Sequence, residues 1–362
     1  MAAEDTSKVS EAYPMNGGDG PNSYAKNSTY QRAVVVVAKE LLNKAIVEKL
    51  DKDIKLSFNT FHIADLGCSV GPNTFYSVEN ILEAVQSKYR IQGKNSQIPE
   101  FQVFFNDHSR NDFNMLFKSL PQNRGYFAVG VPGSFHGRVF PSASIHIAHS
   151  SYAIQWLSRV PEAVVDRDSS AWNKGRIHYS NSTDEVIRAH ETQYNKDMEC
   201  FLHSRAQEIV HGGLMILMIP GRPDGTPHSH SLANITLQFL GLCLKDMARK
   251  GVVSEDKVDS FNIPMYTMSP QELKAAIERN GCFSIEIMSD LPHALVSDTI
   301  SISELLASHL RAGLEGIVKQ QFGEEILDEL FRLYRKKCEE NASIFESETA
   351  VNFLVVLRRT AD

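Results

Sequence analysis

The sequence predicts an α/β protein whose parallel or mixed sheet is covered by helices on both faces. Short apolar segments alternate with amphipathic helical segments along the first part of the chain. A turn rich in glycine and proline, IADLGCSVGPNT (63–74), joins the first strand to a helix. Long helical segments interrupt the later strands and exceed the length of a simple crossover, so they predict a helical cap inserted into the α/β core.

The first half of the chain supplies four expected strands and three expected helices. Apolar residues in the segment 30–50 recur at helical spacing. Pro72 stands near the first turn of the next helix, where proline is favoured. The expected strands are 61–67, 101–105, 126–131 and 144–149, and the expected helices are 30–50, 72–89 and 112–120.

The second half is expected to hold three more strands, separated by the long helical segments. Prolines and glycines between 220 and 227 mark one junction between the core and the insert. The expected strands are 213–219, 282–288 and 351–359, and the helical segments are 156–199, 223–264 and 293–347.

Composition excludes several classes of protein. The formal net charge of −7 argues against a nucleic-acid partner, which requires a basic surface. The five cysteines form no CxxC pair and are odd in number, which indicates free thiols rather than a zinc knuckle or a disulfide framework. The polar N-terminus (1–14) lacks the apolar region of a signal peptide and is expected to be a disordered tail. The apolar run 33–38 is far shorter than the roughly 20 residues of a membrane span, so we expect a cytoplasmic protein without a membrane partner.

The turn at 63–74 matches neither of two familiar glycine loops. A P-loop requires a Lys after its second glycine, and a dinucleotide fingerprint requires GxGxxG, whereas this turn has only GxxxG. Asp65 and Asp107 each end a predicted strand beside the turn, where a carboxylate can accept hydrogen bonds from ribose hydroxyls. A ligand with a ribose, an ammonium group and no phosphate is S-adenosylmethionine (SAM). A plain βα turn with a capping aspartate is the alternative that this turn alone leaves open.

Further segments decide between these alternatives, because together with the turn they closely resemble the plant SABATH family of SAM-dependent methyltransferases. That family forms methyl esters of small acids such as salicylate, jasmonate and loganate, and includes N-methyltransferases of xanthines. The resemblance extends from Met15 to the C-terminal VVLRR. The matching segments are MNGGDGPNSYAKNSTYQ (15–31), FFNDHSRNDFNMLFKSLP (104–121), GVPGSFHGRVFP (130–141), HSSYAIQWLSRVP (149–161), SRAQEIVHGGLMIL (204–217) and KVDSFNIPMYTMSP (257–270).

The resemblance implies a class I methyltransferase with a Rossmann-like mixed sheet and an inserted helical cap. The SAM-binding core is expected to comprise 15–155, 200–222, 265–292 and 348–362, and the cap over the acceptor pocket to comprise 156–199, 223–264 and 293–347. The family commonly forms homodimers, so a homodimer is expected here too.

The resemblance also assigns the residues that hold the methyl donor. Many family members carry Leu after the ribose-binding aspartate, whereas this chain has His108, a difference that can alter the adenosine contact. The expected donor-binding residues are Tyr24, Ser28, Asp65, Gly67, Cys68, Asn73, Asp107, His108, Ser134 and Phe135.

By the same resemblance, Gln31 and Trp156 hold the carboxylate of the acceptor. Their chemistry suits the task, because an amide and an indole both offer N–H donors. A hydrogen bond to a charged group contributes roughly 1.5–3 kcal/mol. Without the resemblance, Gln31 would be a solvated helix residue and Trp156 a core aromatic.

The remaining acceptor pocket is expected to involve Tyr152, Gln155, Ile219, Tyr266, Leu310 and Gly313. Salicylate-type members carry Met before the tryptophan, and jasmonate, loganate and caffeine types commonly carry His, so Gln155 predicts contact with a polar group of the acceptor. Gly313 stands where salicylate-type pockets place a bulkier residue. It predicts room for an acceptor larger than a benzoate, with a helix-packing glycine as the alternative.

The implied reaction requires no acid or base residue. A carboxylic acid with a pKa of about 4 is already ionised at neutral pH. Attack on the methyl group of a sulfonium is an in-line displacement in which opposite charges cancel, so the protein contributes proximity and a dry site. We therefore assign no catalytic base among the histidines, and expect structural or pocket-lining roles for His146 and His149.

Some family members bind a divalent ion near the cap. The matching positions are Asn173, Asp259, Phe261 through its backbone, and Asn262. Oxygen ligands of this kind suit a structural Mg²⁺, and a capped loop without an ion is the alternative.

Three other functions remain as alternatives. An N-methyltransferase of a xanthine or another heterocycle would act on a neutral acceptor, and Gln31 beside Trp156 favours a carboxylate instead. A non-catalytic binding protein for a small acid would not need the donor motif. A dinucleotide oxidoreductase is remote, because the third glycine of its fingerprint is missing.

Overall fold

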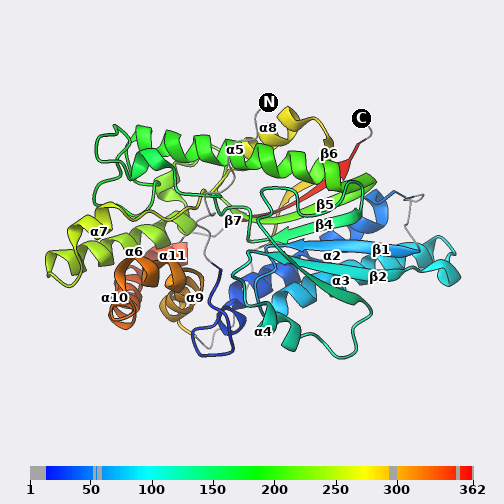
Figure 1. Cartoon of the computed structure of the whole chain (residues 1–362), viewed down its shortest axis with the longest axis horizontal. Coiled ribbons are helices and arrows are strands. Elements are labelled where there is room, and N and C mark those ends of the chain that lie inside the picture. Colours follow the sequence, from blue (N-terminus) through cyan, green and yellow to red (C-terminus); the bar gives the residue numbers. More distant parts are fainter. Residues whose placement is uncertain (1–13, 52–53, 55–58, 293–299, 348–350, 361–362) are drawn as a thin grey trace.

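A computed structural model describes residues 14–51, 54, 59–292, 300–347 and 351–360 of the chain (Figure 1). The predicted tail 1–14 lies outside this part except for Pro14. Seven strands form one sheet in the order β3-β2-β1-β4-β5-β7-β6, so the predicted mixed α/β sheet is confirmed. The strands are β1 Thr60–Leu66, β2 Glu100–Asp107, β3 Phe127–Pro132, β4 Ile145–Ser151, β5 Ile209–Gly221, β6 Phe283–Asp290 and β7 Val351–Arg359.

The strand directions bring the expected donor residues to one edge of the sheet. Strands β1 to β5 pair in parallel, and β7 lies antiparallel between β5 and β6. Asp65 of β1 pairs with Phe105 of β2 on one side and His149 of β4 on the other. Because β1, β2 and β4 run in the same direction, their carboxyl ends and the loops after them meet at this edge, where α/β folds bind ligands.

Helices cover both faces of the sheet, as the alternating pattern predicts. One face packs against α2 (Thr29–Lys49) and α3 (Pro72–Ile91), whose apolar residues form one core with β1, β2 and β5. The other face packs against α5 (Asp184–Glu208) and α8 (Pro270–Asn280), which form a second core with β4, β5 and β7. Helix α8 begins with a capping box, in which Ser269 and Glu272 satisfy each other's backbone N–H groups.

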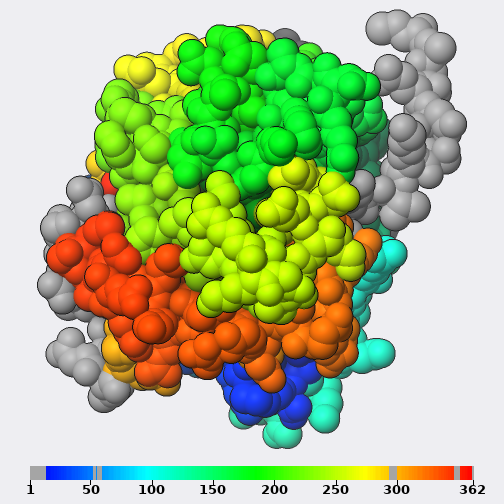
Figure 2. All heavy atoms as spheres, turned by 90° about the vertical axis from the view of Figure 1, so that its left-hand side faces the viewer, coloured from blue at the N-terminus to red at the C-terminus, as the bar shows by residue number. Residues whose placement is uncertain are grey.

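A third apolar cluster lies away from the sheet and forms the cap. The cap helices occupy the left side of Figure 1, and Figure 2 shows α6, α7, α9 and α10 in the middle and lower part of that face, below the green segment that leads into α5. They are α6 Leu232–Arg249, α7 Glu255–Asp259, α9 Ile302–Phe322, α10 Leu327–Glu340 and α11 Ala342–Ser347. The shorter elements elsewhere are α1 Tyr24–Asn27, α4 Phe113–Lys118 and the 3-10 turns η1 Asn95–Gln97, η2 Glu162–Val164 and η3 His228–His230.

The segment 156–199 differs from the mostly helical stretch that the sequence predicts. Only the turn η2 interrupts irregular chain before α5 begins at Asp184. Side chains of α5, including Tyr194, Met198 and Phe201, are buried in the core that also contains the sheet. The apolar face of α5 continues to residue 206 and covers strands, so this helix packs on the sheet rather than on the cap helices. No helix in the described ranges is long and apolar enough to cross a bilayer.

Candidate active site at the carboxyl ends of β1, β2 and β4

The loop after β1 has the backbone that its glycines predict. Gly67 and Gly71 have positive φ angles of 78° and 104°, and Ser69 between them has a φ of 51°. The N–H groups of Gly67 and Cys68 both donate to the carbonyl of Asn106, at 2.9 and 3.0 Å, which ties the loop to the end of β2. A Cβ at Gly67 would overlap that of Ala153, so only glycine fits there without a shift.

Asp107 is the buried carboxylate at the end of β2. Its Oδ2 accepts from the N–H of Ser69 at 2.7 Å, and its Oδ1 accepts from the N–H of His108 at 2.7 Å. Burial raises the pKa of Asp107 to about 6, although these two N–H groups favour the charged form. Each oxygen retains lone pairs that can accept a ribose hydroxyl.

Asp65 lies beside the same loop but is bound more completely by the protein. Its Oδ1 lies 2.6 Å from Nδ1 of His149, and its Oδ2 accepts from the hydroxyl of Thr74. The carboxylates of Asp65 and Asp107 add to burial in raising the pKa of Tyr24 and that of Cys68. Tyr24 and Cys68 therefore face the two carboxylates, and four of the expected donor residues lie together.

Ser28 and Asn73 also lie together, and they bond each other. Nδ2 of Asn73, in the first turn of α3, donates to Oγ and to the carbonyl of Ser28, both at 2.9 Å. This contact joins the N-terminal segment to the helix that follows the glycine loop.

The loop 134–141, which carries Ser134 and Phe135, is held from below by a buried ion pair that the sequence did not single out. Arg205 and Glu208, one turn apart on α5, form an ion pair of 2.7 Å, with each side chain 1% exposed. Arg205 donates to the carbonyl of Phe135 at 2.8 Å, and Glu208 accepts from the N–H of Val139 at 2.6 Å. The sequence does show two opposite charges at i, i+3 spacing on a helix, which permits an ion pair. The same spacing is equally typical of exposed helix faces, so it does not indicate that the pair is buried.

His108 occupies the position at which many members of the family that this sequence resembles carry Leu. Burial, assisted by the nearby His136, lowers the pKa of His108 to about 4. The imidazole is therefore uncharged at neutral pH, and it adds no positive charge next to Asp107.

Gln31 lies in the first turn of α2, and its side chain is engaged with the cap. Gln31 is 5% exposed, and its Nε2 lies 3.1 Å from Nδ1 of His309 on α9. Its Oε1 is buried and has no hydrogen-bond partner among the described residues. The amide is thus a buried polar group rather than a solvated helix residue, and His309 is a neighbour that the sequence did not predict.

Trp156 lies at the junction of core and cap. Its backbone forms an isolated antiparallel bridge with Met265, and its N–H donates to the carbonyl of Ala153 at 3.0 Å. The side chain is half-buried and packs against the apolar cluster of the cap. Trp156 is therefore accessible in part, unlike a fully buried core aromatic.

Tyr152 and Gln155 are fixed by polar contacts. Tyr152 has a φ of 55°, and its hydroxyl donates to Oδ1 of Asn352 on β7. Nδ2 of Asn352 in turn donates to the hydroxyl of Tyr30 at 2.9 Å. Nε2 of Gln155 donates to the carbonyl of Tyr152 at 2.8 Å. Oε1 of Gln155 is buried without a partner among the described residues, so the amide presents an unpaired acceptor beside the second N–H of Nε2.

The surroundings of Tyr266 and Gly313 differ from those expected of residues that line an open acceptor pocket. The Tyr266 ring stacks between Tyr179 and Tyr194, with ring centroids 5.2 and 4.7 Å away, and its hydroxyl donates to Glu272 at 2.7 Å. At Gly313, a Cβ would lie 3.6 Å from the sulfur of Met15. The N-terminal segment therefore occupies the space beside this glycine, which favours the helix-packing interpretation. Ile219 is fully buried in the sheet core, and Leu310 is buried in the cap cluster.

The four positions matched to a metal site form a hydrogen-bonded loop. Nδ2 of Asn173 donates to Oδ1 of Asn262 at 2.6 Å, and Oδ1 of Asn173 accepts from Ser182 at 2.6 Å. Asp259 accepts from the N–H of Gly175 at 2.8 Å, and the ring of Phe261 packs in the cap cluster. The two amide oxygens are thus already bonded and one carboxylate supplies the only charge, which fits a capped loop better than a cation site. In the described ranges no three His, Cys, Asp or Glu side chains gather as metal ligands.

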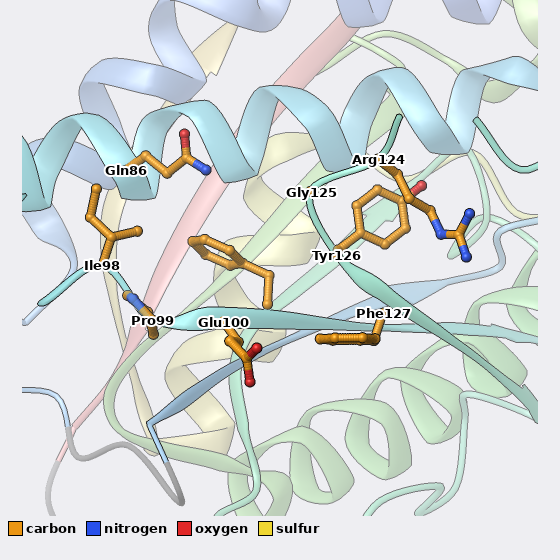
Figure 3. Close-up of a pocket in the computed structure, with 9 residues that line it drawn as sticks. Gln86, Ile98, Pro99, Glu100, Arg124, Gly125, Tyr126 and Phe127 are labelled. Carbon is orange, nitrogen blue, oxygen red and sulfur yellow. The ribbon is translucent and has the colours of Figure 1, made fainter. Parts of the chain in front are cut away.

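A surface hollow of about 280 Å³ lies elsewhere, beside the edge strand β3 (Figure 3). Gln86, Ile98, Pro99 and Glu100 line it with Arg124 to Phe127. Glu100 and Phe127 begin β2 and β3, so the hollow lies at the amino ends of these strands, opposite the glycine loop at the carboxyl ends.

Comparisons with known proteins find relatives over nearly the whole chain. A family model described as SAM dependent carboxyl methyltransferase matches residues 10–360. Loganic acid O-methyltransferase of Catharanthus roseus is 47% identical over 355 residues, covering 96% of this chain and 95% of that protein. Farnesoic acid carboxyl-O-methyltransferase of Arabidopsis thaliana is 43% identical over 352 residues, covering 97% of this chain and all of that protein. A solved structure of loganic acid methyltransferase with SAH matches with a TM-score of 0.92 at 46% identity, covering 96% of this chain and 99% of that one.

Proposed function

The chain belongs to the plant SABATH family of SAM-dependent carboxyl methyltransferases, which methylate small carboxylic acids. We propose that this protein methylates such an acid and that Gln31 and Trp156 orient the acceptor. SAM supplies a methyl group on a positively charged sulfur. The observation that most supports the proposal is the group of Asp107, Asp65 and Tyr24 around a left-handed glycine loop. Such a group can take a donor that carries a ribose and an ammonium and has no phosphate.

The proposed donor site combines a carboxylate that accepts hydrogen bonds with a loop backbone of defined shape. Asp107, whose two oxygens each accept one backbone N–H, accepts the ribose hydroxyls with its remaining lone pairs. Gly67 and Gly71 give the loop its left-handed turns, and Ala153 and Ala25 pack against them where a Cβ would otherwise lie. Ser134 and Phe135, on the loop held by Arg205, flank the adenine.

The proposed acceptor site needs no base. The acceptor acid is ionised at neutral pH, because its pKa is about 4. An N–H of Gln31 and the indole N–H of Trp156 hold the carboxylate, and the cap excludes water. Orientation and proximity together can lower the barrier by up to roughly 7–11 kcal/mol.

The acceptor is further proposed to carry a hydrogen-bond donor. Nε2 of Gln155 is bonded to Tyr152, and Oε1 is the buried atom of the amide that has no partner among the described residues. An amide oxygen can only accept, as from a hydroxyl of the acceptor. We also propose a homodimer, on the family resemblance, and a cytoplasmic location, on the five cysteines, which are all free thiols.

A methyl-transfer assay with radiolabelled SAM tests the proposal. Purified protein is offered a panel of plant carboxylic acids, in matched pairs with and without a hydroxyl, together with xanthines. Labelled methyl esters of one or more acids are expected. Label on a xanthine nitrogen would select N-methylation instead, and acid binding without transfer would indicate a non-catalytic binding protein.

A further inference from the structure

Asn352 is a buried amide at the carboxyl edge of the sheet. It is the second residue of β7, and it pairs with Pro220 near the end of β5 because the two strands run antiparallel. Its side chain lies on the face of the sheet that α2 covers, as do those of Leu354 and Val356 at alternate positions along the strand. Asn352 is 3% exposed, so its amide must find hydrogen-bond partners within the protein.

The amide of Asn352 bridges the hydroxyls of two tyrosines that belong to different elements. Oδ1 accepts from the hydroxyl of Tyr152, in the turn after β4, and Nδ2 donates to the hydroxyl of Tyr30, in the first turn of α2, at 2.9 Å. A turned amide would keep both contacts, because a phenol hydroxyl can both donate and accept. The two rings meet edge to face, with centroids 6.2 Å apart and planes at 85°. The bridge therefore joins β7 to α2 and to the turn after β4.

Each bridged tyrosine belongs to a segment that carries a residue proposed to orient the acceptor. Tyr30 directly precedes Gln31 in the chain. Tyr152 begins the turn that ends at Trp156, and its carbonyl accepts from Nε2 of Gln155 at 2.8 Å inside that turn. The bridge thus connects the two segments whose side chains are proposed to hold the acceptor carboxylate.

The backbone of Tyr152 gives a second reason to expect that neighbouring contacts hold this residue. Its φ of 55° lies in the left-handed region, which a bulky side chain rarely adopts. Such a conformation persists only where the surrounding structure fixes it, and it is frequent at functional sites. The N–H of Tyr152 donates to the carbonyl of Met218 at 2.9 Å, and the contact with Asn352 holds the far end of the side chain. The amide of Asn352 is therefore one of the contacts that keep Tyr152 in place.

We propose that Asn352 is a positioning residue for methyl transfer, which keeps Gln31 and Trp156 at a fixed separation by bonding a tyrosine in the segment of each. The inference rests on the proposed role of Gln31 and Trp156. The carboxylate can meet the methyl group in line only while its two hydrogen-bond donors stay in place, and a displacement of about 1 Å can cost up to about 100-fold in rate. Neither side-chain partner of Asn352 belongs to the expected donor-binding residues, so the affinity for the donor should not depend on it.

Methyl-transfer kinetics of Asn352→Leu, Tyr30→Phe and the double variant test the proposal, with the acid found by the radiolabel panel as the acceptor. Asn352→Leu removes the whole bridge at similar side-chain volume, and Tyr30→Phe cuts only its end on α2. Both are expected to lower kcat, by roughly 10- to 100-fold in Asn352→Leu. Because the bridge acts as a unit, the double variant should lie within about twofold of Asn352→Leu. The dissociation constant of SAH, measured by calorimetry, should stay within about twofold of the wild type in all three.

Asn234→Leu is the matched control for a general loss of stability. Asn234 is also fully buried, and its amide bonds the carbonyl of His228 at 2.9 Å and the hydroxyl of Thr267 at 2.7 Å. This variant should lower the Tm about as much as Asn352→Leu does, because each removes two hydrogen bonds of a buried amide. Its kcat, measured below the Tm, should stay within about twofold of the wild type.

The outcomes separate this inference from the proposed function. A wild-type protein that transfers no methyl group to any acid contradicts the proposed function itself. With an active wild type, an unchanged kcat in Asn352→Leu overturns the inference, as do weakened SAH binding, a multiplied loss in the double variant, or an equal loss of kcat in Asn234→Leu. If Asn352→Leu fails to fold, Tyr30→Phe decides. A fall in its kcat with unchanged SAH affinity supports the inference, and a wild-type kcat overturns it.

Discussion

The backbone N–H of Ser69 donates to Oδ2 of Asp107 across 2.7 Å, and so joins the glycine loop after β1 to the last residue of β2. The loop has no freedom to move away from the carboxylate without losing this contact. The protonation state of Asp107 therefore affects both the loop and the binding of the donor.

The affinity for the donor is expected to fall as the pH is lowered through about 6. Burial raises the pKa of Asp107 to about 6, and only the ionised form is a strong acceptor for ribose hydroxyls. Binding then favours loss of the proton, so affinity is highest above pH 6 and decreases about tenfold per pH unit well below it. Calorimetric titration with SAH between pH 5 and 8 measures this. Asp107→Asn should bind more weakly and show a flat profile, and a profile like that of the wild type would contradict the assignment.

Removal of either side chain that is proposed to donate a hydrogen bond to the acceptor carboxylate is expected to reduce kcat/KM for the acceptor acid. Gln31→Leu and Trp156→Phe each remove one hydrogen bond to a charged group, which corresponds to roughly 1.5–3 kcal/mol or 10- to 150-fold. The KM for SAM should change little. Gln97→Leu, at an exposed glutamine, and Trp172→Phe, at the second tryptophan, serve as matched controls. Full activity in both test variants would exclude the proposed acceptor site.

Gly67→Ala is expected to destabilise the protein more than Gly93→Ala does. The two glycines have similar φ angles, 78° and 71°, so the left-handed backbone costs each alanine a similar 1–2 kcal/mol or so. A Cβ at Gly93 meets nothing within 4 Å, whereas one at Gly67 overlaps Ala153. The difference between the unfolding free energies of the two variants, measured in urea, gives the cost of the steric overlap at residue 67. Equal losses of unfolding free energy would show that the loop shifts without cost. Donor binding should weaken only in Gly67→Ala.

Glu208→Gln is expected to cost roughly 3–5 kcal/mol of unfolding free energy, because it leaves the buried charge of Arg205 unpaired. The loop 134–141 loses part of its support, so the affinity for SAH should fall as well. The matched control is Glu185→Gln, which breaks an i, i+3 pair that is exposed and should cost far less, because solvent screens the pair. Similar unfolding energies for the two variants would show that the buried pair is not a determinant of stability.

Gln155→Met is expected to change the acceptor profile without loss of donor binding. The variant removes the buried Oε1, so acids that offer a hydroxyl should lose their advantage over matched acids without one. The ratio of kcat/KM values within each pair of acids is the measurement. A ratio unchanged from the wild type would dismiss Gln155 as a specificity residue.

The sequence by itself determined the sheet and its glycine loop. All seven expected strands are present, with one predicted at 126–131 and observed at Phe127–Pro132. Buried parallel strands are continuous apolar runs, and the glycines of the loop are needed for its positive φ angles, so both leave a local pattern in the sequence. The family resemblance assigns the expected donor residues for the same reason, since they lie in short contiguous motifs.

Only the tertiary structure decided which side chains meet across the cap. The contact of His309 with Gln31, the sulfur of Met15 beside Gly313, and the hydroxyl of Tyr266 on Glu272 all depend on packing between elements. The orientation of the Gln155 amide depends on where the carbonyl of Tyr152 points. Such contacts arise from the packing of elements that are far apart in the chain. They produce no regular spacing in the sequence, because each partner lies in a different helix or strand with its own local pattern.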